Sequence, residues 1–279
     1  MRPRSFFYYT SLEGERKSWL EKLLSEGQIY FKSREQLNDI NELRPKFALG
    51  KNAEERKNYV RDLVEKEGAG LSPAQKLLKR RNLLNRFNFR NGAVESSFHQ
   101  ILDRSGIFSL SETIDSHVLW GNYANNYGGI VIEFDSNIGL FDLANRVAYQ
   151  EDMPLVDIIN DSHEIITQKM VLTKLKQWEH EQEWRVIAAR EDSEGNIGYA
   201  EKFRNASAET IAFLCASHGP GYYQIPNESI VAIIMGLRIS SADRVWLQSL
   251  TRSLEMNHLL VDTVRNSNGS ISKDAIVVS

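Results

Sequence analysis

The chain has 279 residues, 42% of them hydrophobic and 25% charged, and its formal net charge at pH 7 is -3. These values exclude a disordered chain and one with a strongly one-sided charge, so composition alone names no partner. The single cysteine, Cys215, can form no internal disulfide, which is typical of a reducing compartment. No segment has the length and apolar character of a signal peptide or a membrane span. We therefore expect a cytoplasmic protein without a membrane partner, organised as one domain (1–279) with a helical insertion (50–106).

The first residues predict two short strands around a helix. Phe6 to Thr10 is aromatic and β-prone, and Ile29 to Lys32 is the second strand. Between them, Glu15 to Ser25 has leucines at helical spacing, and Gly27 follows as a stop signal.

The insertion contains a basic run with aromatic residues. It carries six cationic and no acidic residues over one helical stretch, and its candidate nucleic-acid contacts are Lys79, Arg80, Arg81 and Arg86. Such a run can bind phosphates and stack on bases. The alternative is an amphipathic helix whose leucines Leu77, Leu78 and Leu84 face the core while its charges are solvated.

The middle of the chain predicts a strand, a short helix and a buried strand. These are Ile107 to Leu110, Ser116 to Tyr123, and Gly129 to Phe134. The pair Gly128-Gly129 permits a tight turn and the close approach of another backbone or a ligand.

The later chain mixes strands and helices without a regular βαβ repeat, which favours an α+β fold. Apolar spacing predicts a helix from Ile165 to Glu179 and a strand from Trp184 to Ala189. Further strands are predicted at Val147 to Tyr149, Ile211 to Cys215, Ile230 to Met235, Leu259 to Val264 and Ala275 to Val278, with a helix at Ala242 to Met256.

The junction between that helix and strand is rich in charge. If the chain is extended there, Glu181, Glu183 and Arg185 share one face of a strand whose other face, including Trp184, is core. A helix continuing past Glu183 would dissolve this arrangement. A fixed carboxylate beside aromatic rings suits chemistry that passes through an oxocarbenium-like cation.

Several enzyme classes lose support because their motifs are missing. The sequence has no Walker-type phosphate loop, no dinucleotide GxGxxG after a strand, no GxSxG elbow and no HExxH. The six histidines are scattered, and we expect no metal site.

The motifs occur in an order that resembles a widespread bacterial family of domains of unknown function. They are FYYTS, an ND-x-x-E element, S-L-S-E with W-x-x-Y-A-x-x-Y-x-G-x-x-I-E-F, K-x-x-x-W-x-x-E-x-E-W-R and I-I-x-G, from Phe6 to about Gly236. The chain departs from that pattern at Ile40-Asn41, where Pro-Phe is usual, at Gly-Asn before Tyr123, and in the basic insertion.

A more distant similarity is to ADP-ribosyltransferases, including those of bacterial toxin and phage-defence systems that modify nucleic acid or protein. It implies NAD as substrate, no metal, and a central mixed or antiparallel sheet split into two small sheets. The similarity implies that Glu183 stabilises the sugar cation and Glu181 orients or deprotonates the acceptor. It also implies a cofactor site formed by Tyr9, Thr10, Ser109, Trp120 and Tyr123, with Trp120 or Tyr123 stacking on nicotinamide. We expect Arg185 to complete this site by holding a phosphate.

Two other functions stay open on the sequence. One is a non-catalytic module that binds nucleic acid or a partner through the basic helix. The other is a metal-dependent nuclease that uses Asp39, Glu133 and Glu183.

Overall fold

The fold comes from a computed structural model that describes residues 2–89, 96, 98, 99, 102, 103, 105–188 and 219–275, apart from the side chains of 86–89, 163, 164, 167, 274 and 275. The α-helices are α1 (Arg16–Glu26), α2 (Ala53–Glu67), α3 (Pro73–Phe89), α5 (His117–Asn122), α6 (His163–Val171) and α9 (Ser241–Ser253). The 3-10 helices are η1 (Arg34–Gln36), η2 (Gly139–Leu143), η3 (Lys176–Glu181), η4 (Asn227–Ser229) and η5 (Asn257–Leu259).

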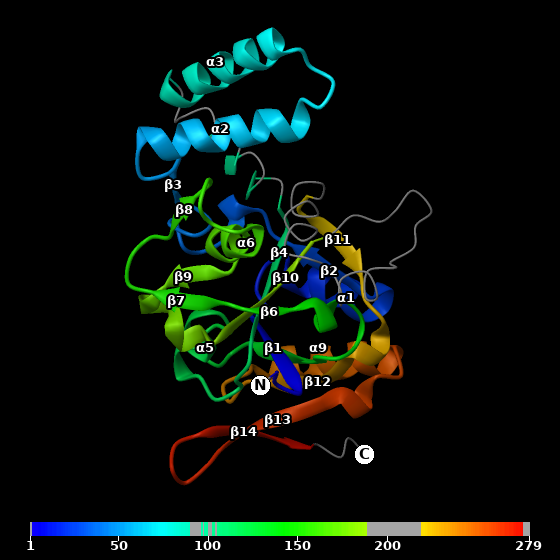
Figure 1. The fold of residues 1–279 in the computed structure, drawn as a ribbon. Coiled ribbons are helices and arrows are strands. Elements are labelled where there is room, and N and C mark those ends of the chain that lie inside the picture. The colour runs from blue at the N-terminus through cyan, green and yellow to red at the C-terminus, as the bar shows by residue number, and fades with distance from the viewer. Residues whose placement is uncertain are drawn as a thin grey trace.

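The strands alternate with these helices, which confirms the α+β prediction (Figure 1). They are β1 (Ser5–Thr10), β2 (Gln28–Phe31), β3 (Lys46–Ala48), β4 (Ile107–Ser111), β5 (Ile130–Asp135), β6 (Asn145–Arg146), β7 (Ala148–Gln150), β8 (Leu155–Asp157), β9 (Thr173–Leu175), β10 (Glu183–Ile187), β11 (Gly221–Gln224), β12 (Ile230–Met235), β13 (Leu260–Arg265) and β14 (Ile271–Ala275). The predicted strand at Ile211 to Cys215, with Cys215 itself, lies outside the described residues, as do Ala189 and the end of the terminal strand.

The central sheet is mixed and has the strand order β14-β13-β12-β5-β1-β4-β10-β6. Its pairs are antiparallel except for β12 with β13. Where two separate small sheets were expected, the ladder is continuous. However, β1 and β4 are joined by one residue pair, Phe7 with Ser111, whereas β1 pairs with β5 along its whole length. The sheet is therefore held together weakly at its middle.

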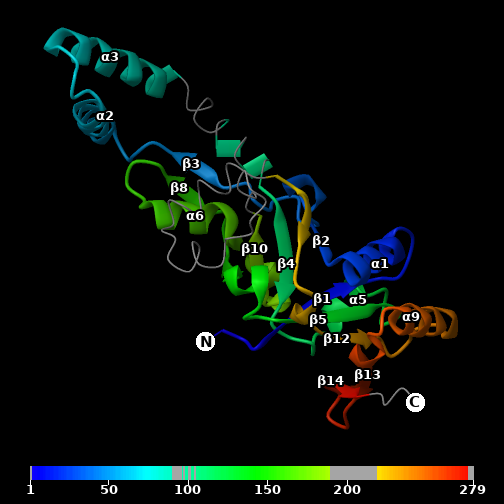
Figure 2. The same cartoon turned by 90° about the vertical axis from the view of Figure 1, so that its right-hand side faces the viewer.

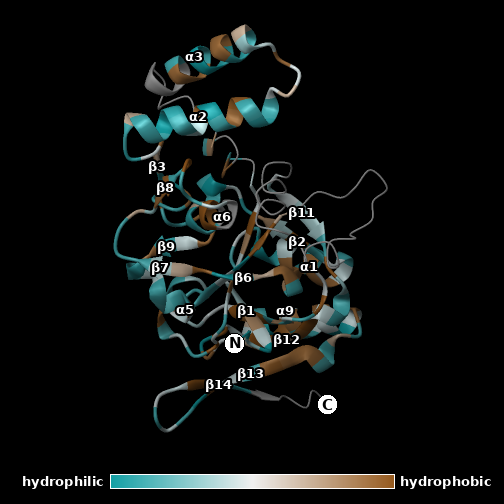
Figure 3. Ribbon diagram, in the orientation of Figure 1, coloured by the Kyte–Doolittle hydropathy of each residue, from teal (hydrophilic) through white to brown (hydrophobic). Residues whose placement is uncertain are grey.

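Helices cover both faces of this sheet. Leucines 20, 23 and 24 of α1 and Leu247 of α9 pack with Phe6, Phe134 and Trp184 in the largest core cluster. On the other face, α5 packs Trp120 against Tyr9. Figure 3 shows β12 and β13 in hydrophobic colours and α2 mostly in hydrophilic ones, as expected for central strands and an outlying helix.

The predicted ends of the first elements are confirmed. Helix α1 ends at Gly27, whose φ of 65° lies in the left-handed region and whose N–H donates to the carbonyl of Leu23. Helix α5 begins after Ser116, whose hydroxyl accepts from the N–H of Leu119. A Cβ on Gly129 would lie 2.3 Å from the carbonyl oxygen of Thr10, so the expected close backbone approach is real.

The long helix predicted from Ile165 to Glu179 is wrong in its second half. Helix α6 ends at Val171, and β9 follows and pairs in parallel with β7 before the 3-10 helix η3 begins. Apolar spacing is similar in a helix and in such a short buried strand, so periodicity could not reveal this long-range pairing.

Helices α2 and α3 lie side by side at one end of the molecule, and β13 and β14 lie at the other (Figures 1 and 2). Helices α2 and α3 confirm that the first part of the predicted insertion is helical, while the division into a domain and an insertion stays a prediction.

Candidate functional site

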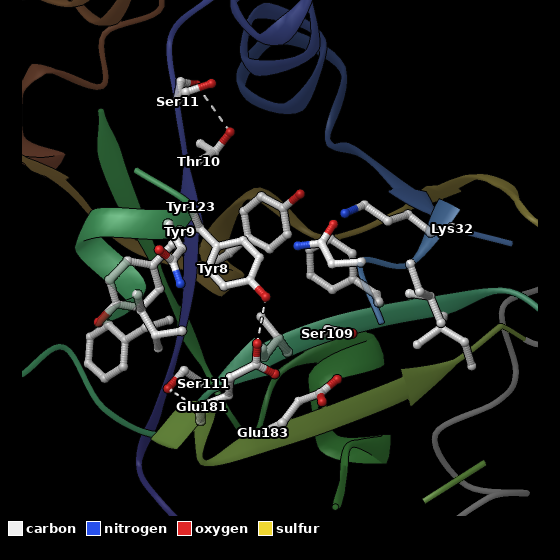
Figure 4. A pocket seen from close by; sticks show the side chains of 18 of the residues that line it. Tyr8, Tyr9, Thr10, Ser11, Lys32, Ser109, Ser111, Tyr123, Glu181 and Glu183 are labelled. Atoms are coloured by element: carbon white, nitrogen blue, oxygen red, sulfur yellow. Dashed lines mark hydrogen bonds between the residues drawn. The ribbon is translucent and has the colours of Figure 1, made fainter. Parts of the chain in front are cut away.

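The strands β1 and β4 separate beyond the pair Phe7 with Ser111, and a cavity of about 440 Å³ lies where they diverge. Its wall includes Tyr8, Tyr9 and Thr10 from β1 and residues Ile107 to Ser111 from β4. Figure 4 shows side chains from both strands around the same space. The volume is in the range of small-molecule sites, about 300–1,000 Å³. The weakly paired middle of the sheet thus creates a candidate site of small-molecule size.

Two glutamates form the floor of this cavity. Glu181 is the last residue of η3, and Glu183 is the first of β10. Gln182 between them has a φ of 45° and a ψ of 52°, a left-handed conformation that side-chain-bearing residues adopt infrequently. This turn brings both carboxylates to one cation: the Nζ of Lys174 lies 2.6 Å from an oxygen of Glu181 and 3.3 Å from one of Glu183.

The prediction that side chains alternate between the two faces of an extended strand is therefore confirmed only from Glu183 onward. Glu183 and Arg185 share one face of β10, and Trp184 and Val186 pack into the core on the other. Glu181 reaches the same place through the turn at Gln182 and not through an extended backbone.

A buried ion network supports the floor of the cavity. The guanidinium of Arg185 donates from Nε to Glu183 at 2.8 Å and from Nη1 to the carbonyl of Val171 at 2.8 Å, and it also pairs with Glu42. Lys174 lies 3.8 Å from the other oxygen of Glu42. Three carboxylates thus face two cations, which leaves an unbalanced negative charge when all five groups are ionised.

Burial and neighbouring charges shift the pKa of three members of this network: Glu183, Lys174 and Arg185. Burial raises the pKa of Glu183, although the charge of Lys174 opposes the change. For Lys174, burial lowers the pKa, but the carboxylates of Glu183 and Glu181 outweigh it and hold the pKa above its usual value. Burial lowers the pKa of Arg185 to about 9, so this side chain is still charged at neutral pH.

Two tyrosines orient the glutamates. The hydroxyl of Tyr123, from the end of α5, donates to Glu181 at 2.5 Å, and the N–H of Glu183 donates to the hydroxyl of Tyr149 at 2.8 Å. Burial and then the nearby charge of Glu181 raise the pKa of Tyr123, so its phenol is neutral and can donate at physiological pH. Figure 4 shows Tyr123 directly above the carboxylate of Glu181.

Most of the predicted site residues meet in this cavity. Those that line it are Tyr9, Thr10, Ser109, Tyr123, Glu181 and Glu183. The hydroxyl of Tyr9, however, donates to the carbonyl of Thr113 at 2.8 Å. The Tyr9 ring therefore belongs partly to the packing behind the cavity.

Trp120 and Arg185 do not lie where their predicted roles require. Trp120 is fully buried, donates from Nε1 to the carbonyl of Ile114 and stacks on Tyr127, so its ring is not free to stack on nicotinamide. Arg185 is also fully buried, and its guanidinium is engaged by protein oxygens, so it is not free to hold a phosphate. Neither position fits the predicted role, because tertiary packing that the sequence does not show uses both side chains inside the fold.

Sequence reasoning missed three cations of the cavity wall: Arg16, Lys32 and Lys174. Lysine is seldom fully buried, so Lys174 reads as a surface residue. The available signal was its position at the start of the K-x-x-x-W-x-x-E-x-E-W-R motif, where it precedes the two glutamates by seven and nine residues.

The basic helix is partly neutralised by its neighbour. Lys79 and Arg80 of α3 pair with Glu67 and Glu65 of α2. Arg81 is exposed, and the side chain of Arg86 lies outside the described part of the chain. Nucleic-acid binding by this helix stays a prediction, and its available charge is smaller than the sequence indicates.

The leucines of α3 also differ from the expectation of a core-facing stripe. Leu77 is 67% exposed and Leu78 is 60% exposed, and Leu84 is half-buried. Three ion pairs join α2 and α3, and Leu77 and Leu78 stay largely exposed to solvent.

Two of the three proposed nuclease carboxylates, Glu133 and Glu183, lie on separate strands of the sheet. Glu133 shares a row of the sheet with Glu183, but β1 and β4 lie between their strands, so about 14 Å separates them at the usual strand spacing. Glu133 pairs instead with Lys273. Within the described residues, no group of three or more His, Cys, Asp or Glu side chains is arranged to hold a metal ion.

Among the residues that the structure describes, no helix is both long and apolar enough to cross a bilayer. Comparisons of the chain with family models, with curated proteins and with solved structures found no match.

Proposed function

We propose that this chain is an NAD-dependent ADP-ribosyltransferase-like enzyme that cleaves the nicotinamide glycosidic bond at the cavity between β1 and β4. The observation that carries the proposal is the pair Glu181 and Glu183 on the floor of the cavity between β1 and β4, which are joined by one residue pair. The similarity to ADP-ribosyltransferases implied a late E-x-E element, and the position of this pair in the cavity supports that assignment.

The charge of the site suits the reaction. Departure of nicotinamide leaves positive charge on the ribose, and a preorganised negative charge stabilises that cation more than it stabilises the neutral sugar. The buried network supplies such charge, because Glu42, Glu181 and Glu183 exceed Lys174 and Arg185 by one. Its groups are already fixed by hydrogen bonds, so little reorganisation accompanies the reaction.

The two glutamates then have different roles. Glu183 is held by Arg185 and Lys174, which makes it the fixed charge that stabilises the sugar cation. Glu181 accepts a hydrogen bond from Tyr123 and is the group that orients or deprotonates the acceptor, which is a nucleic acid or a protein.

The test is release of nicotinamide from NAD by the purified protein. Glu183→Gln keeps the side-chain shape and removes the charge, so we expect a loss of about a hundredfold or more. Glu179→Gln is the matched control, because Glu179 lies on η3 close to Glu181 but is exposed. Thermal melting of each variant shows whether the fold is intact. Full activity in a folded Glu183→Gln protein would contradict the proposal.

A further inference from the structure

Arg16 and Lys32, two cations of the cavity wall, differ from Lys174 in the charges around them. Arg16 is the first residue of α1, and Lys32 directly follows β2. Within the described part of the chain, neither forms an ion pair with an acidic side chain, although Lys174 in the same cavity contacts Glu181 and Glu183. The cavity therefore has a positive side as well as its negative floor.

Lys32 is held firmly and is half-buried. Its backbone N–H donates to the carbonyl of Ile107 at 2.8 Å, and its carbonyl accepts from the N–H of Ile107 at 2.9 Å. Figure 4 shows the Lys32 amine reaching into the cavity from the β2 side, with Glu181 and Glu183 at the floor. The main chain of Lys32 is therefore anchored to β4, and its side chain starts from a fixed position beside the cavity.

The field around Lys32 is positive. Burial lowers the pKa of Lys32, and the positive charges of Arg16 and Lys174 lower it further, while Glu183 acts in the opposite direction. Placing two like charges together in a partly buried wall is unfavourable unless an anion lies between them. A bound anion would remove this repulsion and would gain charge-assisted hydrogen bonds from both groups.

We propose that Arg16 and Lys32 form a subsite for the diphosphate of a nucleotide. A guanidinium and an ammonium present several hydrogen-bond donors to phosphate oxygens. Two separate cations also match the two charged groups of a diphosphate better than they match a ligand with a single carboxylate. A sugar attached to that diphosphate would then extend toward Glu183. The identification of the nucleotide as NAD rests on the proposed function, whereas diphosphate binding by itself does not.

The experiment is calorimetric titration of the full chain with inorganic pyrophosphate, ADP-ribose and adenosine. The variants are Arg16→Met, Lys32→Met and Lys32→Arg. Lys22→Met is the matched control, because Lys22 lies on α1 over the ring of Tyr222 and does not line the cavity. Thermal melting of every variant confirms that it is folded.

We expect pyrophosphate and ADP-ribose to bind the wild-type chain more tightly than adenosine. Loss of either cation should weaken pyrophosphate binding about tenfold or more, Lys32→Arg should retain most of it, and Lys22→Met should change nothing. Equal pyrophosphate affinity in wild type and folded Lys32→Met, or no binding of pyrophosphate and ADP-ribose to wild type, would overturn the subsite. If the subsite binds but NAD is not cleaved, only the proposed function fails; if NAD is cleaved with an unchanged KM in Lys32→Met, only the subsite fails.

Discussion

Replacement of Lys174 by methionine tests whether the ion network under the cavity is built as the structure shows. Methionine keeps the length and the apolar stem but removes the charge that joins Glu42, Glu181 and Glu183. Three carboxylates would then face Arg185 alone. Breaking a buried ion pair by removing one partner typically costs about 3–5 kcal/mol, which is a large part of the usual 5–15 kcal/mol of domain stability.

The matched control is Lys176→Met. Lys176 is two residues away on the same stretch of chain, but it is exposed and pairs with the exposed Glu151. Exposed pairs contribute little, so we expect no measurable change in the free energy of unfolding. Urea denaturation of the wild type and both variants measures the difference.

The pH dependence gives a second readout. The pKa of Lys174 is raised in the folded state, so its stabilising contribution is complete below the pKa of an unfolded lysine and is lost only at higher pH. In the variant, the uncompensated carboxylates can take up protons as the pH falls, and the raised pKa of Glu183 favours this. The loss of stability in Lys174→Met should therefore be smaller at pH 5 than at pH 8. If Lys174→Met has the same free energy of unfolding as Lys176→Met at pH 8, the proposed network is refuted.

Three further changes test single contacts. Tyr123→Phe removes the hydrogen bond that fixes the Glu181 carboxylate, so NAD cleavage should fall about tenfold while the protein stays folded; unchanged cleavage would contradict the contact. Gln182→Val places a β-branched residue at a φ of 45° and should cost about 1–2 kcal/mol in urea unfolding, whereas Gln182→Gly should be tolerated; equal losses would argue against the turn. Gly129→Ala forces a Cβ toward the carbonyl of Thr10 and should lower stability by about 1–3 kcal/mol, and an unchanged melting temperature would exclude that close approach.

Local signals in the sequence were sufficient for much of the fold. Gly27 ends α1, Ser116 begins α5, and the alternation from Glu183 to Val186 gives the two faces of β10. The two helix ends and the two faces of β10 each depend on residues that are close in the sequence. The local pattern of side chains therefore predicts them.

The candidate site depends on contacts between segments that are far apart in the sequence. The spacing of apolar residues along the chain does not reveal such contacts. The sequence shows Arg185 as a cation available to a ligand, but Glu42 from another part of the chain covers it. Lys174 reads as a surface lysine until the turn at Gln182 brings two glutamates to it. The separation of β1 from β4, which creates the cavity, is likewise a property of strand pairing.

The most direct measurement of the central claim is chromatographic quantification of nicotinamide released from NAD by the wild-type chain, Glu183→Gln and Glu179→Gln. We predict release by the wild type and by Glu179→Gln, unaffected by a metal chelator, and a loss of about a hundredfold or more in folded Glu183→Gln. No release by the wild-type chain with any acceptor, or equal release by all three proteins, would contradict the assignment of Glu183 and its cavity to NAD cleavage.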